Sequence, residues 1–503
     1  MKRILIRLYW GAMFGLLLLN ISVSGQTIQG FLRRSNTQIV NNQGAVELKG
    51  VNLGNWLHIE PYMIQAEATA TRNHTILSQQ ITQLTGDTTF AAQFFTQWRD
   101  TFIQEKDIEL LANLGFNHLR VPFPSHLFWN ETTNLPTDEG FIYLDRIIQW
   151  GKKYDLYIIL DLHEAPGGQI DGELWSNFEV NKTRTIDIWR RIATRYAQEP
   201  TVGGYDILNE PLITNQADQW KLRDLYLAIT QAIRMVDSNH ILFFEGNWYA
   251  SSFWELTDGT PSENDRWDSN MAFSHHVYWV PLPSQTTLWV DDIATNMNIP
   301  VWCGEGGENS NHWIADWIQD CQNNQMGWCF WTYKKAASIS SVVTHALSAN
   351  YRQITAFWKG EGTQPSTSVA RQGFLDLIQG SDLNQCTQSR DVQDALLRTD
   401  FLTKAKPFKN HSIPGTIQAV DFDLGGNNVG YRDAAFQSTG QGANYTNYNQ
   451  GWTYRNDGVD IETWTGSPTV GQISADEWLQ YSIQVPNPGL YQIKLEYATT
   501  SSS

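Results

Sequence analysis

The feature that most constrains this chain is an alternation of short apolar runs with longer helix-like segments. The runs are rich in β-branched, aliphatic and aromatic residues, which is typical of buried strands. They are Val46 to Leu53, Phe116 to Phe123, Leu156 to His163, Gly204 to Asn209, His240 to Glu245, Ala272 to Tyr278, Val301 to Glu305 and Gly327 to Tyr333. Segments with helical periodicity lie between them: Thr101 to Asn113, Leu144 to Lys153, Arg184 to Ala197, Leu222 to Val236, Leu288 to Asn296 and Trp313 to Asn323. Strands that alternate with helices predict a parallel sheet.

The eight predicted strands, with helices between them, favour a closed (β/α)8 TIM barrel over an open doubly wound sheet. An open sheet of the dinucleotide-binding kind has a glycine-rich turn after its first strand, whereas Asn52-Leu53-Gly54-Asn55-Trp56 carries no such fingerprint. A barrel places its chemistry at the carboxyl ends of its strands. Those ends are Arg120, His163, Asn209 with Glu210, Glu245, His276 with Tyr278, Glu305 and Trp331.

Composition excludes several classes of function. Asp and Glu number 52 against 35 Lys and Arg, so a polyanionic partner such as nucleic acid is not expected. Apolar residues make up 41% of the chain, which excludes a disordered protein. No zinc-type ligand spacing and no phosphate-binding loop occur, so no metal and no cofactor is predicted for catalysis. The 22 Trp suit both an aromatic core and stacking on sugar faces.

Residues 1–25 have the pattern of a signal peptide. Lys2, Arg3 and Arg7 precede an apolar run from Leu8 to Ile21, and small residues follow it. The run is shorter than the ~20 residues that span a bilayer, although an uncleaved anchor stays an alternative. We therefore expect a secreted monomer, extracellular, at the cell surface or periplasmic, with no membrane span in the mature chain.

The four cysteines are Cys303, Cys321, Cys329 and Cys386, and a secreted protein permits but does not require disulfides among them. Their pairing stays open, since four cysteines allow three full pairings. Side chains alternate between the two faces of a strand, so Cys303 should share a face with Glu305, and Cys329 with Trp331. We therefore predict that these two are buried thiols that point into the barrel.

The sequence changes character after Pro407. The helical period gives way to Gly, Asn, Thr and aromatic residues, which predicts a catalytic domain over 26–407, a linker over 408–415 and an all-β module over 416–503. Alternating segments predict strands at Val459 to Ile461, Trp478 to Tyr481 and Tyr491 to Leu495.

Glu210 and Glu305 are the predicted catalytic pair. Any single Glu at a loop is most often solvated or caps a helix, but these two end the fourth and seventh strands, which meet across one barrel mouth. Cleavage of a glycosidic bond needs two carboxyl groups, one to protonate the leaving oxygen and one to stabilise or capture the sugar carbon. Their surroundings must push the two pKa values apart.

Several motifs in order resemble glycoside hydrolase family 5. They are Gly115 to Pro122, Asp161-Leu162-His163, Tyr205 to Asn209 with Glu210-Pro211, and Pro300 to Gly307, and the resemblance spans residues 46 to about 360. It implies a retaining β-glycosidase with Glu210 as acid/base and Glu305 as nucleophile. Glu308 is a weaker alternative for the nucleophile.

The same resemblance implies the substrate-binding residues. Arg120 and Tyr278 would hydrogen-bond the nucleophile and keep its pKa low, and Asn209 would contact the sugar 2-hydroxyl. Trp331 would form the platform under the reacting sugar. Strand parity favours His276 over His275 as the residue that faces the site. For His276 and His163, a histidine with a purely structural role in the core is the alternative.

Within the family, the segments Gly50 to Leu57 and Asp161 to Gln169 resemble the branch of exo-acting β-1,3- and β-1,6-glucanases more than the cellulases. Glu164 departs from that branch, which has a small residue there. Trp175, Trp248, Tyr249 and Trp279 fall in loops at the predicted rim, where they would line further sugar subsites.

The C-terminal residues resemble carbohydrate-binding module family 6, a β-jelly roll, here incomplete. The matching segments are Ile417 to Ala419, Asp421 to Gly426, Tyr431 to Asp433, Arg455 to Ile461, Glu477 to Tyr481 and Pro488 to Tyr491. The resemblance implies glycan binding and a structural calcium, although Gln418 stands where an acidic residue is common.

We therefore predict a secreted retaining β-glycoside hydrolase that acts on β-glucan-type polysaccharide or oligosaccharide. A non-catalytic glycan-binding protein and a transglycosylase using the same residues are the alternatives. Sequence leaves the linkage, mannan or xylan as substrates, and endo or exo action open.

Overall fold

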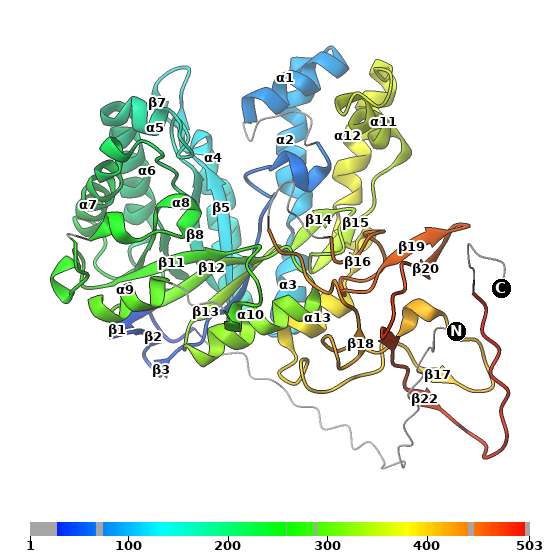
Figure 1. Cartoon of the computed structure of the whole chain (residues 1–503). Helices are drawn as coiled ribbons and strands as arrows, with labels where there is room; N and C mark the ends of the chain where they lie inside the picture. The colour runs from blue at the N-terminus through cyan, green and yellow to red at the C-terminus, as the bar shows by residue number, and fades with distance from the viewer. Residues whose placement is uncertain (1–27, 67–73, 258, 286–288, 441–446, 498–503) are drawn as a thin grey trace.

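Eight parallel strands close into a barrel in the computed structural model of the chain (Figure 1). The structure describes residues 28–66, 74–257, 259–285, 289–440 and 447–497, so the predicted signal peptide lies outside the described residues. The barrel strands are β4 (Lys49–Asn52), β5 (His118–Pro124), β8 (Tyr157–Glu164), β9 (Val202–Asp206), β10 (Leu242–Glu245), β11 (Met271–Val277), β12 (Val301–Gly307) and β13 (Gly327–Trp331). All eight coincide with the predicted runs, and β13 closes the barrel by pairing with β4.

Helices surround the barrel as the alternation predicts. They are α3 (Glu105–Leu114), α4 (Glu139–Tyr154), α6 (Phe178–Tyr196), α7 (Trp220–Arg234), α9 (Trp289–Met297) and α10 (Asn311–Asn323). Local sequence sets their ends: Ser310 caps α10 through the Trp313 amide, and Gly115 ends α3 in the left-handed conformation. Among the described residues, none of the helices combines the length and apolarity that a membrane span requires.

Five longer helices fall outside the predicted set. They are α1 (His74–Thr85), α2 (Thr88–Phe102), α11 (Ala349–Trp358), α12 (Thr367–Gly380) and α13 (Arg390–Leu397). Figure 1 shows α1, α2, α11 and α12 gathered beside one edge of the barrel, and Phe94 of α2 packs against Phe374 of α12. Two short helices, α5 (Glu173–Ser176) and α8 (Asn247–Ala250), follow β8 and β10.

Small sheets complete the barrel's surroundings. One antiparallel sheet consists of β1 (Arg33–Ser35), β2 (Gln38–Asn41) and β3 (Gly44–Ala45). A second sheet is the pair of β6 (Trp129–Asn130) and β7 (Leu135–Pro136). A third sheet contains β14 (Lys334–Ala336), β15 (Val343–His345) and β16 (Thr387–Gln388). Leu32 and Ile39 from the first of these join the apolar cluster inside the barrel. That cluster contains Ile159, Phe243, Trp302 and Cys329, so part of the barrel interior is a packed apolar core.

A bulge in β12 corrects the prediction for Cys303. The register of β12 shifts between Cys303 and Gly306 against β13, and between His275 and His276 on β11. Cys303 therefore packs in the outer core near Cys321 of α10, whereas Glu305 faces inward. Cys329 lies in the inner cluster as predicted. All four cysteines are free thiols in the structure.

The C-terminal residues form three separate two-stranded pairs. These join β17 (His411–Ser412) to β22 (Ile483–Gln484), β18 (Tyr431–Arg432) to β21 (Trp478–Leu479), and β19 (Ile461–Trp464) to β20 (Ser467–Val470). A small core holds them together: Val420, Phe422, Tyr431, Val459 and Ile461. The predicted linker 408–415 thus contains β17, while the domain boundaries themselves stay predictions.

The predicted strand at Tyr491 to Leu495 is wrong for the part of the chain that the structure describes. These residues are not assigned to a strand, and Ile493 and Leu495 are exposed. A strand needs a partner for its backbone groups, and no residue from 491 to 495 is paired in any described sheet. The alternation in the sequence therefore does not suffice to make a strand here.

Buried asparagines join the C-terminal residues to the loop that follows β12. Asn456 donates from its side chain to the Asn309 carbonyl at 2.8 Å and accepts from the Asn311 amide at 2.8 Å. Its own amide donates to Asp391 at 2.7 Å. Asn309 and Ser438 exchange two hydrogen bonds of 2.9 Å, and the Gly440 amide donates to the Trp279 carbonyl at 3.2 Å. These contacts fix residues 438–440 against loops at the carboxyl ends of β11 and β12.

We expect Asn456→Ala to destabilise the full chain by about 2–4 kcal/mol, because it removes two buried hydrogen bonds of the side chain, one donated to the Asn309 carbonyl and one accepted from the Tyr448 hydroxyl. Urea unfolding would measure the loss. Asn323→Ala, at an exposed position at the end of α10, is the matched control and should change stability by less than about 0.5 kcal/mol. Equal stability of the two variants would show that these contacts contribute nothing.

Candidate active site

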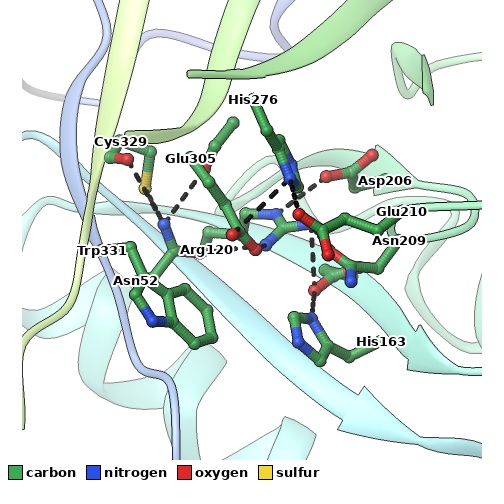
Figure 2. Close-up of polar contacts among 12 residues, drawn as sticks. Asn52, Arg120, His163, Asp206, Asn209, Glu210, His276, Glu305, Cys329 and Trp331 are labelled. Atoms are coloured by element: carbon green, nitrogen blue, oxygen red, sulfur yellow. Dashed lines mark hydrogen bonds and ion pairs between the residues drawn. The ribbon is translucent and has the colours of Figure 1, made fainter. Parts of the chain in front are cut away.

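Two carboxyl groups face each other at the carboxyl ends of β9 and β12. One oxygen of Glu210 and one of Glu305 lie within 4.8 Å of each other, and a ring nitrogen of His276 also lies within 4.8 Å of both. Figure 2 shows His276 between the two side chains. Its Nδ1 is 3.0 Å from Glu210 Oε1 and 3.5 Å from Glu305 Oε2. The structure thus brings together the two glutamates that the sequence singles out.

Glu210 lies on a constrained backbone at the rim. Its φ is 44°, a left-handed value that few residues other than glycine adopt, and Pro211 follows it. The amide of Glu210 donates to Glu245 Oε2 at 2.6 Å, and the Asn209 amide donates to the Leu162 carbonyl at 3.1 Å. The Glu210 side chain keeps 16% of its surface exposed, so it can reach a bound molecule.

Glu305 is the buried member of the pair. Arg120 Nη1 donates to its Oε1 at 2.5 Å, and the Tyr278 hydroxyl donates to its Oε2 at 2.9 Å. Burial nevertheless raises the pKa of Glu305 to about 7. The positive charges of His276 and Arg120 lower this pKa, and the nearby Glu210 raises it further. Both predicted hydrogen bonds to Glu305 are therefore present and Arg120 lowers its pKa, but burial has the larger effect, so the expectation of a low pKa is wrong.

Arg120 is the centre of the polar half of the barrel interior and is fully buried. Register places it beside Asn52 on β4, and it donates to the oxygens of Asn52 at 3.1 Å and Asn209 at 2.9 Å. Besides Glu305 it pairs with three carboxyl groups: Asp161 at 3.1 Å, Asp206 at 2.8 Å and Glu245 at 3.1 Å. Its guanidinium thus links five barrel strands and the loop after β9.

The cluster of Asp161, Asp206 and Glu245 has the spacing of a metal site, with oxygens within 4.8 Å of one another. Arg120 already supplies a positive charge to all three. Burial and the nearby Glu245 raise the pKa of Asp206 well above its usual range, which favours a neutral Asp206. The donor set therefore suits the guanidinium rather than a divalent ion.

The surroundings of His276 favour a charged ring. Burial opposes its charge, but Glu245 and Glu305 outweigh that effect and raise the pKa of His276 well above its usual range. Its Nε2 is 3.3 Å from Glu245 Oε1. His276 therefore faces the site, as parity predicts, whereas its neighbour His275 belongs to the other face of β11, next to Cys303.

His163 and Trp331 form the opposite wall of the site (Figure 2). Their rings are nearly parallel, with centroids 5.5 Å apart. His163 Nδ1 is 2.7 Å from Asp161, and although burial opposes the charge, Asp161 raises the pKa of His163 to about 10. The Trp331 indole donates to the Tyr62 hydroxyl at 2.8 Å. Gly54 permits this position, because a Cβ there would lie 2.7 Å from the Trp331 ring.

Glu60, Asp161 and Asp206 are site residues that the sequence reasoning missed, whereas it places Glu245 at a strand end but gives it no role. Strand parity could have found Asp161 and Asp206, which share a face with His163 and Arg120. Glu60 Oε1 lies 3.9 Å from His163 Nε2 and is buried, but it follows an irregular loop and no periodicity points to it. Glu308, the alternative nucleophile, accepts a hydrogen bond from Lys335 at 2.7 Å rather than from Arg120 or Tyr278.

The aromatic residues predicted at the rim differ in their surroundings. Trp175 is buried, donates to the Gln169 carbonyl and stacks near Phe178, so it belongs to the core rather than to a sugar subsite. Trp248 and Tyr249 are exposed. Trp279 is half-buried beside Tyr278. Glu164 lies 3.5 Å from His58, and burial raises its pKa to about 7.

Comparison with known proteins finds a family model that matches the part of the chain that carries this site. The model of the cellulase family, glycosyl hydrolase family 5, matches residues 77–337. A β-xylosidase of Phanerodontia chrysosporium is 27% identical over 60% of this chain and 71% of its own length. Endoglucanase C of Acetivibrio thermocellus is 35% identical over 36% of this chain, and a probable glucan 1,3-β-glucosidase A of Aspergillus fumigatus is 29% identical over 41%.

The chain spans about half the length of these last two relatives, 51% of each. Among solved structures, the rutinosidase from Aspergillus niger is similar with a TM-score of 0.47 and 19% identity, covering 57% of this chain and 90% of that one. The endoglucanase Cel5A from Thermotoga maritima is similar with a TM-score of 0.42 and 18% identity, covering 57% and 89%.

Proposed function

Because the chain belongs to the cellulase family, glycosyl hydrolase family 5, whose members are glycosidases, we propose that it hydrolyses β-glucan-type polysaccharide with retention of configuration. The observation that carries the proposal is the approach of the Glu210 and Glu305 oxygens to within 4.8 Å. Retaining glycosidases hold their two carboxyl groups about 5–5.5 Å apart, whereas inverting enzymes leave about 6.5–9.5 Å for a water molecule. The approach of these two oxygens supports a retaining rather than an inverting geometry.

In the proposed reaction Glu305 attacks the anomeric carbon while Glu210 gives a proton to the leaving oxygen, so the glycosidic bond breaks as an ester to Glu305 forms. Water then loses a proton to Glu210 and displaces Glu305 from the sugar, which restores both groups. Arg120 and Tyr278 orient the Glu305 carboxylate for the attack. The His276 ring lies between the two side chains and lowers the pKa of Glu305, which favours the carboxylate that attacks.

The named relatives act on β-linked sugars, by their names β-xylosides and glucans with 1,3 linkages among them, which supports the substrate class but leaves the linkage open. Product analysis on soluble β-1,3-, β-1,4- and β-1,6-glucans, mannan and xylan would decide it. Release of sugars from a β-glucan by the full chain, absent with Glu305→Gln, is the expected result. No release of sugar from any of the glucans would contradict the proposal.

The pH dependence of kcat/KM is expected to report Glu305. Only the carboxylate attacks, and burial raises the pKa of Glu305 to about 7. On the acid side kcat/KM should therefore fall about tenfold for each pH unit below 7. Tyr278→Phe removes a donor that favours the carboxylate, so the acid limb should move to higher pH. An acid limb that stays in place or moves to lower pH would contradict this role of Tyr278.

Secretion and glycan binding by residues 416–503 remain part of the proposal. The first is supported by the pattern of residues 1–25, and the second by the motifs from Ile417 to Tyr491. A structural calcium in this region likewise stays a prediction. The buried contacts of Asn456 indicate that these residues would hold a bound glycan at a fixed position relative to the barrel rather than on a free tether.

A further inference from the structure

The outer face of β12 carries a second cluster of reactive side chains, made of Cys303, Cys321 and His275. Cys303 and His275 are register partners on the neighbouring strands β12 and β11. Cys321 lies on α10, the helix that follows β12, and both cysteine side chains are buried in the core between the barrel and its helices. Cys321 hydrogen-bonds the Cys303 sulfur. The proposed function uses none of these three residues.

The packing of α10 on β12 explains why the two cysteines meet. A helix that connects two parallel strands runs back along them, antiparallel to the first strand. Trp313, Trp317 and Cys321 follow one another at intervals of four residues on one buried face of α10. Trp317 contacts Gly306 of β12, where a Cβ would lie 2.5 Å from the ring. One helical turn after this contact α10 reaches Cys321, and three residues before it β12 carries Cys303.

Cys303 is the more reactive thiol of the pair. Burial raises its pKa, but the hydrogen bond with Cys321 and the neighbouring His275 ring outweigh burial and hold the pKa of Cys303 well below its usual range. The thiolate, rather than the thiol, attacks a disulfide. The surroundings of Cys303 therefore favour the form that begins thiol–disulfide exchange, and Cys321 is placed to complete it.

The other two cysteines are held elsewhere. Cys303 is the register partner of Trp328, so Cys329, the next residue along β13, points to the opposite face of the sheet. Cys329 accordingly belongs to the apolar cluster inside the barrel. Cys386 is half-buried, and its thiol donates to backbone carbonyls of the turn that precedes it. Of the pairings that the sequence leaves open, the structure therefore favours Cys303 with Cys321.

We propose that Cys303 and Cys321 form an intramolecular disulfide when the chain folds in the presence of a small disulfide oxidant such as oxidised glutathione. The Cys303 thiolate attacks the oxidant and releases one glutathione thiolate, and the Cys321 thiolate then displaces the second from the mixed disulfide. The two released thiolates take up the two protons that the cysteines lose, so two electrons reduce one oxidant to two thiols. The free thiols of the structure are the reduced form of this pair.

The position of the bond gives it a structural consequence. Both sulfurs are buried in the folded chain, so the exchange precedes the final packing of α10 on β12. Once formed, the bond ties α10 to the strand that carries Glu305, two residues after Cys303. It closes a loop of about 18 residues, which constrains the unfolded chain and thereby stabilises the folded one.

Refolding of the full chain from urea tests the proposal. The reduced chain is refolded in glutathione buffers that range from reducing to oxidising, and its free thiols are then blocked with iodoacetamide in urea. Chymotrypsin digestion follows, because tryptophans separate the first three cysteines in the sequence. Mass spectrometry should find one cross-linked pair of peptides, joining Cys303 to Cys321, with Cys329 and Cys386 alkylated. Four alkylated cysteines at every glutathione ratio, or a different main pairing, would overturn the proposal.

Urea unfolding in oxidising and in reducing buffer gives a second readout. We expect the unfolding constant of the oxidised chain to be about a hundredfold lower than that of the reduced chain. Cys321→Ala should abolish this difference, whereas Cys386→Ala, the matched control, should retain it. A difference that persists in Cys321→Ala would contradict the assignment. Neither measurement uses a substrate, so their outcome does not depend on the proposed glycosidase function.

Discussion

Glu305→Gln is expected to lower kcat/KM on the hydrolysed glucan by about ten-thousandfold or more, the scale on which loss of a catalytic nucleophile acts. The amide has nearly the same shape as the carboxylate but cannot form the glycosyl ester. The amide oxygen can still accept from Arg120, and the amide NH2 can donate to the Tyr278 hydroxyl oxygen, so the fold should persist. Initial rates of sugar release, together with an unfolding curve of each variant, would measure both expectations.

Glu308→Gln is the matched control for this prediction. Glu308 is three residues away on the same segment and pairs with Lys335, so its loss should change kcat/KM only a few-fold. Glu210→Gln should abolish turnover of the glucan but retain an initial burst of fluoride release from β-glucosyl fluoride, because fluoride departs without protonation whereas the second step lacks its base. Full activity of Glu305→Gln, with loss in Glu308→Gln, would reverse the assignment of the nucleophile.

Arg120→Lys is expected to lower the free energy of unfolding by about 3–5 kcal/mol, the usual cost of breaking a buried ion pair. Four carboxyl groups and two amides surround the guanidinium without access to water. A lysine keeps the charge, but its three donors cannot satisfy six oxygens fixed to the geometry of a planar group. Activity should fall with stability, because Glu305 loses the donor at 2.5 Å.

Arg146→Lys is the control for this substitution. Arg146 pairs with Asp100 at the surface, where an ion pair contributes about 0–1 kcal/mol. Urea unfolding of both variants, with kcat/KM measured on the same preparations, separates a structural loss from a catalytic one. An Arg120→Lys protein as stable and as active as the wild type would contradict the central place of this residue in the barrel.

The barrel could be predicted from the sequence because its strands are buried on both faces and therefore appear as continuous apolar runs. Parity also identified His276 over His275, since β11 alternates regularly up to that pair. The same reasoning failed for Cys303, because the bulge around Gly304 places two consecutive residues on the inner face, and a bulge leaves no trace in apolar periodicity.

Other features depend on contacts that are distant in sequence. The network around Arg120 includes Asp161, Asp206 and Glu245, and no pattern in the sequence joins these three carboxyl groups to one arginine. Glu60 reaches the site from an irregular loop. The sequence predicted a linker and a separate module, but hydrogen bonds between buried polar residues join Asn456 to the loop after β12. Activity should therefore be measured on the full chain rather than on a barrel cut after Pro407.

Covalent trapping would test the central claim most directly. The full chain would be incubated with 2-deoxy-2-fluoro-β-glucosyl fluoride, whose glycosyl ester hydrolyses slowly, and then digested and mapped by mass spectrometry. The account predicts one added fluoroglucosyl group, located on Glu305 and absent from Glu305→Gln. An active enzyme that acquires the group on another residue, or that hydrolyses its glucan and acquires none, would contradict a retaining mechanism with Glu305 as its nucleophile.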